Sequence, residues 1–82
     1  MNIEKVYLVG VNRYCYRAGE RAEVVSLENI QPTESNDWRL AYKVKFDDMV
    51  IDWVALSDVE NGNWVFVTQL KADLGMMPII SK

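Results

Sequence analysis

The sequence predicts an all-β fold, a small antiparallel barrel of five strands. Runs rich in β-branched and aromatic residues occur at five places, and residues that favour turns separate them. Almost no segment has helical periodicity, and short strands that follow one another closely are typical of barrels and sandwiches. A chain of 82 residues fills one hydrophobic core and no second one. We therefore expect a single domain over residues 1–75, followed by an apolar C-terminal tail over residues 76–82.

The first two strands are predicted over residues 3–9 and 21–27, with a loop of partly extended character between them. Residues 31–37 form the clearest loop, since they collect Pro, Ser, Asn and Asp. The third strand, residues 38–46, has the strongest pattern, because apolar residues occupy every second position. We expect these alternate residues to form one buried face, made of Trp38, Leu40, Tyr42, Val44 and Phe46.

The fourth and fifth strands are predicted over residues 50–56 and 64–68. Between them lies a turn region, residues 57–63, which contains the strong turn signal Asn61-Gly62. Both strands are apolar on two faces, so the pattern does not decide which side of the Trp53 strand is buried. The large apolar side chains left outside the core need a cover, which is the N-terminal strand, the C-terminal tail or another chain.

The end of the chain combines a helical signal with an apolar tail. One or two helical turns are predicted over residues 69–75, with Thr68 as the N-cap and Gly75 as the stop. The tail that follows either folds back over the domain or contacts another chain.

Two segments carry a resemblance to known folds: YRAGERAEVV (16–25) and YKVKFDDMVIDWVALSD (42–58), with a Pro-containing loop between them. Over roughly residues 16–60, the chain resembles the small SH3-like domains of bacterial and phage proteins. The second segment is also similar to Tudor domains, although Asp47-Asp48-Met49 stands where those domains carry Asp-Tyr-Gly. That departure removes an aromatic residue from the site with which Tudor domains bind methylated amines. The resemblance implies an SH3-like barrel, and it implies architecture rather than activity.

Composition excludes several kinds of chemistry. The chain has no His and one cysteine, Cys15, which excludes a Cys–His or Ser–His nucleophilic pair, an internal disulfide and an ordinary structural zinc site. The carboxylates of Asp47, Asp48 and Asp52 are interpreted chiefly as turn residues. A recognition patch is the second interpretation of these carboxylates, and metal binding or catalysis is the last. We therefore expect a protein that is not an enzyme, with no catalytic residue, no metal site and no cofactor.

The sequence also predicts a cytoplasmic protein that has no contact with a membrane. The segment MNIEKVYLVG lacks the basic and long apolar regions of a signal peptide. No apolar run approaches the roughly 18 residues that a membrane-spanning helix needs, and a single cysteine fits a reducing compartment.

Charge is distributed unevenly along the chain. Residues 1–45 carry seven Lys or Arg against six Asp or Glu, a net +1, whereas residues 46–82 carry two against six, a net −4. The acidic half repels phosphates, so nucleic acid is not expected as a partner. It favours a partner protein with a basic surface instead.

These features predict a non-enzymatic protein-binding module that docks through an acidic and aromatic face. We expect Trp53 and Trp64 to anchor the partner. The full predicted face comprises Asp47, Asp48, Ile51, Asp52, Trp53, Trp64 and Phe66. Since the resemblance extends to phage proteins, it implies a phage or mobile-element accessory protein that inhibits a host nucleic-acid-handling or defence protein.

Two alternatives are retained. The first is a small nucleic-acid-binding barrel, because Arg39, Lys43 and Lys45 line the polar face of the third strand. The second is a structural or assembly subunit, a homo-oligomer formed through the C-terminal tail, in which deletion of residues 76–82 converts a multimer into a monomer.

Overall fold

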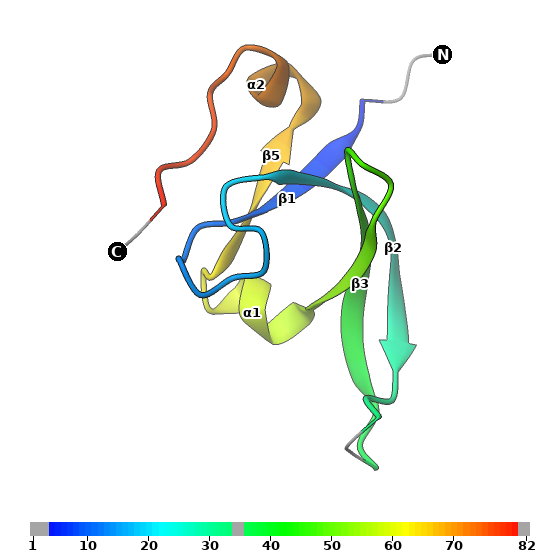
Figure 1. The fold of residues 1–82 in the computed structure, drawn as a ribbon. Coiled ribbons are helices and arrows are strands. Elements are labelled where there is room, and N and C mark those ends of the chain that lie inside the picture. Colours follow the sequence, from blue (N-terminus) through cyan, green and yellow to red (C-terminus); the bar gives the residue numbers. More distant parts are fainter. Residues whose placement is uncertain (1–3, 34–35, 81–82) are drawn as a thin grey trace.

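The computed structural model describes residues 4–33 and 36–80 of the chain. It contains one antiparallel sheet of five strands and two short helices (Figure 1). The elements follow one another as β1 (Val6–Gly10), β2 (Arg21–Ile30), β3 (Arg39–Phe46), β4 (Ile51–Ala55), α1 (Leu56–Glu60), β5 (Trp64–Thr68) and α2 (Gln69–Asp73). The predicted all-β class and its five strands are thus confirmed. Residue 3 of the predicted first strand, residues 34–35 of the predicted loop and residues 81–82 of the predicted tail lie outside the described residues.

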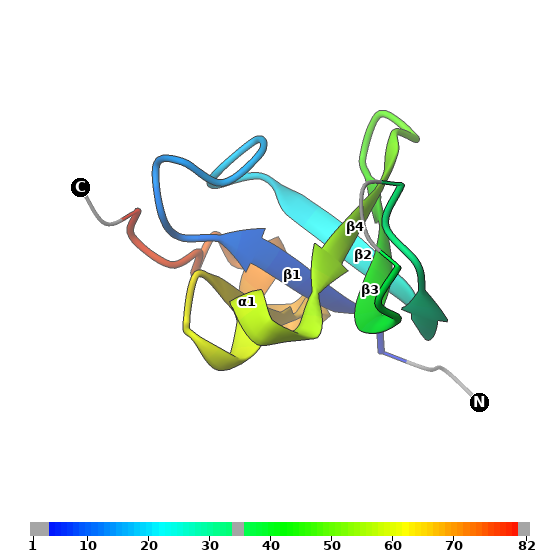
Figure 2. The same cartoon turned by 90° about the horizontal axis from the view of Figure 1, so that it is seen from below.

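The strands lie side by side in the order β4-β3-β2-β1-β5, and every neighbouring pair is antiparallel. β1 therefore lies between β2 and β5. Within residues 4–33 and 36–80, no strand pairing joins β4 to β5, so the sheet is open rather than closed into a barrel. Figure 2 shows how α1 continues from the end of β4 and returns the chain to β5.

One face of the sheet carries the main core, and we call it the core face. Its buried residues come from all five strands: Leu8, Ala22, Val44, Phe46, Val54 and Trp64. Cross-strand partners lie on the same face of a sheet, so Phe66, the partner of Leu8, and Tyr42, the partner of Val54, also belong to the core face. The side of the Trp53 strand that is buried is therefore the side of Val54, and Trp53 lies on the opposite, outer face.

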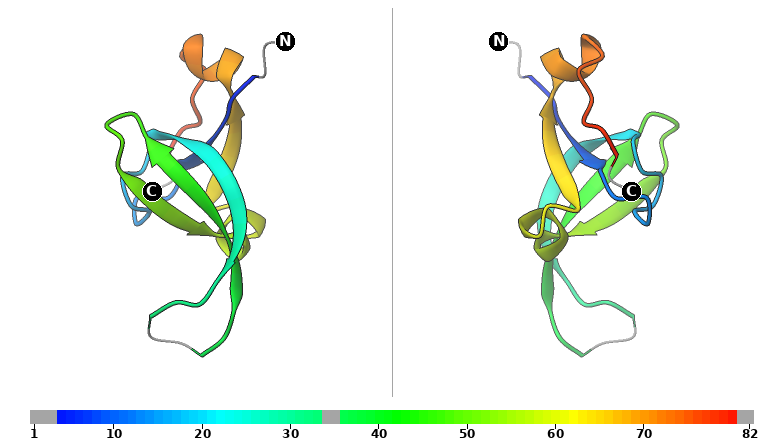
Figure 3. Two further views of the ribbon diagram at one scale, coloured as in Figure 1. Left: turned by 90° about the vertical axis from the view of Figure 1, so that its right-hand side faces the viewer. Right: turned by 90° about the vertical axis from the view of Figure 1, so that its left-hand side faces the viewer.

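The β2–β3 hairpin extends beyond this core (Figure 3, left). Its pairing continues as far as Ile30 and Arg39, with a β-bulge between Val24 and Ser26. The predicted burial of Trp38 and Leu40 is wrong, since these side chains are 63% and 47% exposed. The alternation of the strand is intact, but the rest of the molecule is too small to cover its first residues.

The C-terminal tail folds back over the outer face of β1 and β5. Figure 3 shows it running from α2 along these strands towards the loop between β1 and β2. There, a side chain at Gly19 would meet Ile80, because a Cβ atom at this glycine would lie 2.8 Å from Ile80 Cδ1. Tyr7, Val9 and Val67 are buried on this side of the sheet. The tail is thus part of the domain.

The two helices differ in how well the sequence predicts them. For α2, the prediction is confirmed: the Thr68 hydroxyl accepts a hydrogen bond from the backbone of Lys71 at 3.3 Å, and Gly75 follows with φ of +74°. Residues 56–60, predicted as strand end and turn, instead form α1. Neither helix is long or apolar enough to cross a membrane, and the described residues contain no other helix that could.

Candidate functional site

A cleft of about 290 Å³ opens between the loop of residues 11–20 and the end of β4 with α1. We call it the acidic cleft, because it contains two carboxylates and none of its lining residues is Lys or Arg. Trp64 lies in its wall and is only 6% exposed. The lining residues are Asn12, Tyr14, Cys15, Tyr16, Asp52, Trp53, Val54, Asp58, Asn63 and Trp64.

Hydrogen bonds within the loop hold the tyrosine wall of the cleft. The Asn12 side chain accepts a hydrogen bond from the backbone of Tyr14 at 3.0 Å, and the Asn12 carbonyl accepts one from the backbone of Cys15 at 2.8 Å. The Cys15 thiol donates to the carbonyl of Asn63 at 3.3 Å and so ties the loop to the segment after α1. A Cβ atom at Gly10 would lie 2.6 Å from the Cys15 side chain, so this close approach requires glycine.

Arg17 joins the same loop to the turn between β3 and β4. Its guanidinium donates to Glu20 at 2.8 Å and to Asp48 at 2.9 Å, and it lies 4.5 Å from the centre of the Phe46 ring. The ring of Tyr16 meets the same Phe46 ring edge-on at 5.8 Å. The hydrogen bond from Arg17 lowers the pKa of the Asp48 carboxyl below its usual value. Asp48 is therefore engaged within the fold.

Asp47 has a similar structural role. Arg21 donates to Asp47 at 3.1 Å and to Asp73, at the end of α2, at 3.2 Å. Its guanidinium also lies 4.9 Å from the centre of the Tyr7 ring. The structure thus places Asp47 and Asp48, two residues of the predicted binding face, in ion pairs within the chain.

Asp52 and Asp58 are different, because neither has an ion pair within the described part of the chain. One Asp52 oxygen accepts a hydrogen bond from the backbone of Trp53 at 2.8 Å. Asp58 lies in the first turn of α1, where its backbone carbonyl accepts a hydrogen bond from the backbone of Asn63 at 3.0 Å. The two carboxylates can therefore bind a cation that enters the cleft.

The remaining predicted residues do not lie on one surface. Ile51 and Trp53 are exposed on the outer face, where Trp53 is 39% exposed. Phe66 is exposed on the core face, and its ring meets that of Tyr42 edge-on at 5.5 Å. Only Asp52, Trp53 and Trp64 of the predicted face line the acidic cleft.

Sequence reasoning missed the other seven lining residues of the cleft, among them Tyr14, Tyr16 and Asp58. A signal for the first two was present, because two tyrosines that flank Cys15 in a predicted loop have no strand core to fill. Exposed aromatic residues of this kind are enriched at interfaces. No local signal places Asp58 beside them, since a long-range contact between loop and α1 is required.

The three basic residues of the alternative prediction lie along β3. Lys43 is the cross-strand partner of Trp53, and Lys45 is the partner of Ile51. Arg39 precedes them at the start of the strand. None of the three forms an ion pair with another described residue. They form a basic strip on the outer face, beside an exposed tryptophan.

Among the described residues, no group of three or more His, Cys, Asp or Glu side chains could hold a metal ion. The acidic cleft therefore offers two carboxylates and several aromatic rings to a ligand. No protein-family model, curated protein or solved structure matches this chain.

Proposed function

We propose that the chain is a non-enzymatic protein-binding module whose acidic cleft takes a cationic side chain of a partner protein. One observation carries the proposal: Asp52 and Asp58 lie in one cleft with aromatic residues, without an ion pair to a described residue and without a basic lining residue. A cation over an aromatic face is attracted to the ring, and a carboxylate adds a charge-assisted hydrogen bond.

Arginine is the side chain that fits this site best. Its planar guanidinium donates two parallel hydrogen bonds to a carboxylate and stacks on aromatic rings. The lysine ammonium does neither as well. Ligand pockets for small molecules measure about 300–1,000 Å³, and the cleft, at about 290 Å³, has room for one side chain. It is also open at the surface between exposed tyrosines, as docking onto a folded partner requires.

The proposal extends to the fold and to the kind of partner. The strand order and the loop of residues 11–20 above the cleft support an SH3-like architecture whose sheet is not closed. The net charge of −4 over residues 46–82 supports a partner with a basic surface. Such a surface is typical of proteins that handle nucleic acids, so the module would inhibit a nucleic-acid-handling or defence protein of a host by covering it.

The test is a titration of the isotopically labelled protein with a short peptide that contains arginine, followed by NMR. Matched peptides carry lysine or citrulline, a neutral analogue of arginine, at the same position. We expect the amide and indole signals of Tyr14, Tyr16 and Trp53 to move with arginine, less with lysine and not with citrulline. Since a hydrogen bond to a charged group contributes roughly 1.5–3 kcal/mol, Asp52→Asn and Asp58→Asn should each weaken binding about tenfold or more.

Glu28→Gln is the matched control, because it removes one negative charge from β2, away from the cleft. It should leave arginine binding unchanged. If Asp52→Asn and Asp58→Asn bind arginine as well as the wild type does, the proposal is wrong.

The basic strip supports a second candidate, a small nucleic-acid-binding domain. Lys43 and Lys45 have no ion pair to a described residue and flank the exposed side of Trp53, an arrangement suited to phosphates and stacked bases. Its test is a titration with single-stranded DNA at several salt concentrations. Binding that falls steeply with salt and is lost in Lys43→Glu would favour this candidate over the acidic cleft.

A further inference from the structure

Trp53 belongs to two surfaces of opposite charge. It lines the acidic cleft together with Asp52 and Asp58. On the outer face of the sheet it is the cross-strand partner of Lys43, and the Cβ atoms of such partners lie about 5 Å apart. Trp53 is thus the residue at which the acidic cleft meets the basic strip.

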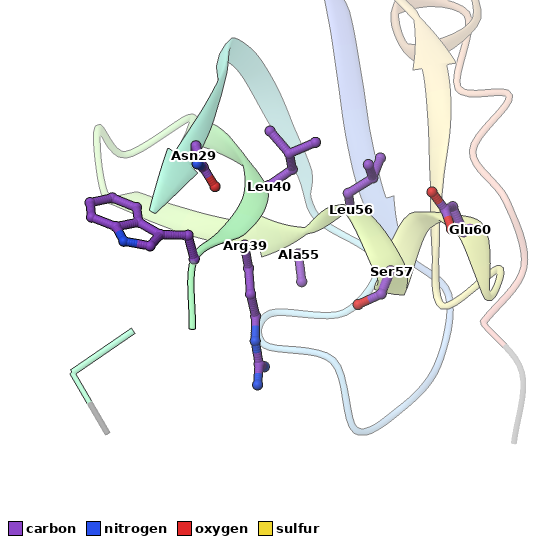
Figure 4. Close-up of a pocket in the computed structure, with 8 residues that line it drawn as sticks. Asn29, Arg39, Leu40, Ala55, Leu56, Ser57 and Glu60 are labelled. Carbon is purple, nitrogen blue, oxygen red and sulfur yellow. The ribbon is translucent and has the colours of Figure 1, made fainter. Parts of the chain in front are cut away.

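The cations of the basic strip share one face of β3. Arg39, Lys43 and Lys45 are separated by even numbers of residues, and alternate residues of a strand point to the same face. Figure 4, a close-up of a pocket beyond the end of β4, shows the Arg39 side chain on the side of β3 opposite to Leu40. Leu40 belongs to the core face, because it is two residues from Tyr42. The outer face therefore presents a row of three positive charges along β3.

Lys43 is the cation of this row that is best placed to bind a ligand at Trp53. Its cross-strand partners, Ser26 on β2 and Trp53 on β4, are both neutral. Glu28, also on β2, accepts a hydrogen bond from the Ser26 hydroxyl at 2.6 Å. Lys43 itself forms no ion pair with another described residue. Its ammonium can therefore bind a carboxylate of a ligand.

The acidic cleft and Lys43 lie close enough for one short segment to reach both. The cleft opens at the end of β4, and no other described strand pairs with the free side of β4. Neighbouring strands lie about 4.8 Å apart, so Lys43, on the next strand, is about two such spacings from a ligand beside β4. Three residues of an extended segment span a similar distance, about 10 Å.

We propose that the segment bound at the acidic cleft carries an Asp or Glu within about three residues of its arginine, and that Lys43 binds this carboxylate. This inference rests on the proposed function and defines its ligand more narrowly. A purely basic segment would bring a second cation to Lys43, where like charges repel each other. A segment with both charges complements Asp52 and Asp58 on one side of Trp53 and Lys43 on the other.

The test is an NMR titration of the labelled protein with a series of peptides. Each peptide has one central arginine among glycine and serine residues, and a glutamate is placed in turn at positions up to about four residues before or after the arginine. Matched peptides carry glutamine at the same position. We expect at least one position at which the glutamate peptide binds about threefold more tightly than its glutamine match, as for an ion pair at a partly exposed site.

Two variants of Lys43 locate the carboxylate, with the ratio of the two affinities as the measurement. Lys43→Gln should abolish the preference for glutamate, and Lys43→Glu should reverse it. Lys71→Gln is the matched control, because it removes one positive charge from α2, outside the cleft. It should keep the preference of the wild type.

The outcomes separate this inference from the proposed function. If arginine peptides bind but no position shows a preference for glutamate, or if Lys43→Gln keeps that preference, the inference is overturned and the arginine site stands. If no arginine peptide moves the signals of the cleft residues, the proposed function and this inference both fail.

Discussion

At the scale of single residues, Met49 adopts a left-handed backbone conformation that is unfavourable for a residue with a side chain. It is exposed in the turn between β3 and β4, with φ of +74°. The left-handed region costs a residue other than glycine roughly 1–2 kcal/mol. The greater freedom of glycine in the unfolded chain costs less, about 0.4–1 kcal/mol. We therefore expect Met49→Gly to raise the free energy of unfolding by about 0.5–1 kcal/mol in urea denaturation.

Val50→Gly is the matched control for this prediction. Val50 is the next residue, it is also exposed, and it does not have a positive φ. Its replacement by glycine should lower the free energy of unfolding, because glycine increases the conformational entropy of the unfolded chain and relieves no backbone strain at this position. A Met49→Gly protein that is less stable than the wild type would contradict the prediction.

Gly19 offers a second test at the same scale. Its φ of +86° disfavours any other residue, and a Cβ atom there would lie 2.8 Å from Ile80 Cδ1. Gly62 has a similar φ of +82° but no atom within 4 Å of a Cβ. Gly19→Ala should therefore lower the free energy of unfolding more than Gly62→Ala, which should cost about 1 kcal/mol.

The difference between these two variants measures the contact between the tail and the loop. In an Ile80→Ala background the obstructing atoms are gone, so the two alanine substitutions should become equally costly. Equal costs already in the wild-type background would show that the tail does not rest on Gly19.

At the scale of the elements, the turn between β3 and β4 should make stability depend on pH. The hydrogen bond from Arg17 lowers the pKa of Asp48 in the folded protein. The carboxyl of Asp48 therefore binds a proton more tightly in the unfolded chain than in the folded one. The contribution of this pair to the free energy of unfolding is complete above the ordinary pKa of aspartate, and it declines as the pH falls through the lower pKa of the folded protein. We therefore expect the free energy of unfolding to decline below about pH 4.

Asp48→Asn removes this titration while keeping the size of the side chain. Urea midpoints measured between about pH 3 and pH 6 should therefore fall less steeply with acidification in Asp48→Asn than in the wild type. Glu60→Gln is an acidic control outside this turn, and its urea midpoint should fall with acidification as that of the wild type does. Parallel curves for Asp48→Asn and the wild type would refute a role for the pair of Arg17 and Asp48.

The sequence predicted the secondary-structure elements better than it predicted which of their side chains are buried. Five strands and α2 were found because alternation and capping are local signals that need no knowledge of the fold. α1 was missed because an apolar run ends at Leu56, the turn-favouring residues Ser57 and Asp58 follow it, and Ala55 has no capping side chain. The predicted burial of Trp38 was wrong, because alternation indicates only which face of the sheet a residue occupies. Whether that face is covered depends on β4, which ends before it reaches Trp38.

For the candidate site, prediction from sequence recovered residues on one element and missed what the fold brings to them. Asp52 and Trp53 were predicted as neighbours on a strand. Their partners across the cleft come from a loop about forty residues earlier in the chain, and no periodicity reports such a contact. Asp47 and Asp48 were predicted to steer a partner, but the arginines that engage them are also distant in sequence.

At the scale of the whole molecule, the tail runs beside β1 and β5 (Figure 3), whose outer face carries a second group of buried residues. Removing residues 76–82 should expose Tyr7, Val9 and Val67 in part. Since a fully buried large apolar side chain contributes about 1.5–3 kcal/mol, we expect the truncated chain to lose at least about 2 kcal/mol of unfolding free energy. Urea denaturation measures this loss.

Met76→Ala is the control for the truncation, because this side chain is exposed and its loss should change little. A truncated chain as stable as the wild type, or one that turns from multimer to monomer, would restore the tail as an interface between copies.

The position of β1 between β2 and β5 affects how the domain folds during synthesis. β1 is made first, yet one of its two neighbours in the sheet is β5, which is made nearly last. Leu8 and Val9 therefore stay uncovered on the ribosome until residues 64–68 have emerged. Contacts so distant in sequence slow folding, and the growing chain has no complete sheet to form earlier. The domain should thus fold as one unit only after residues 64–68 have emerged, when β5 pairs with β1.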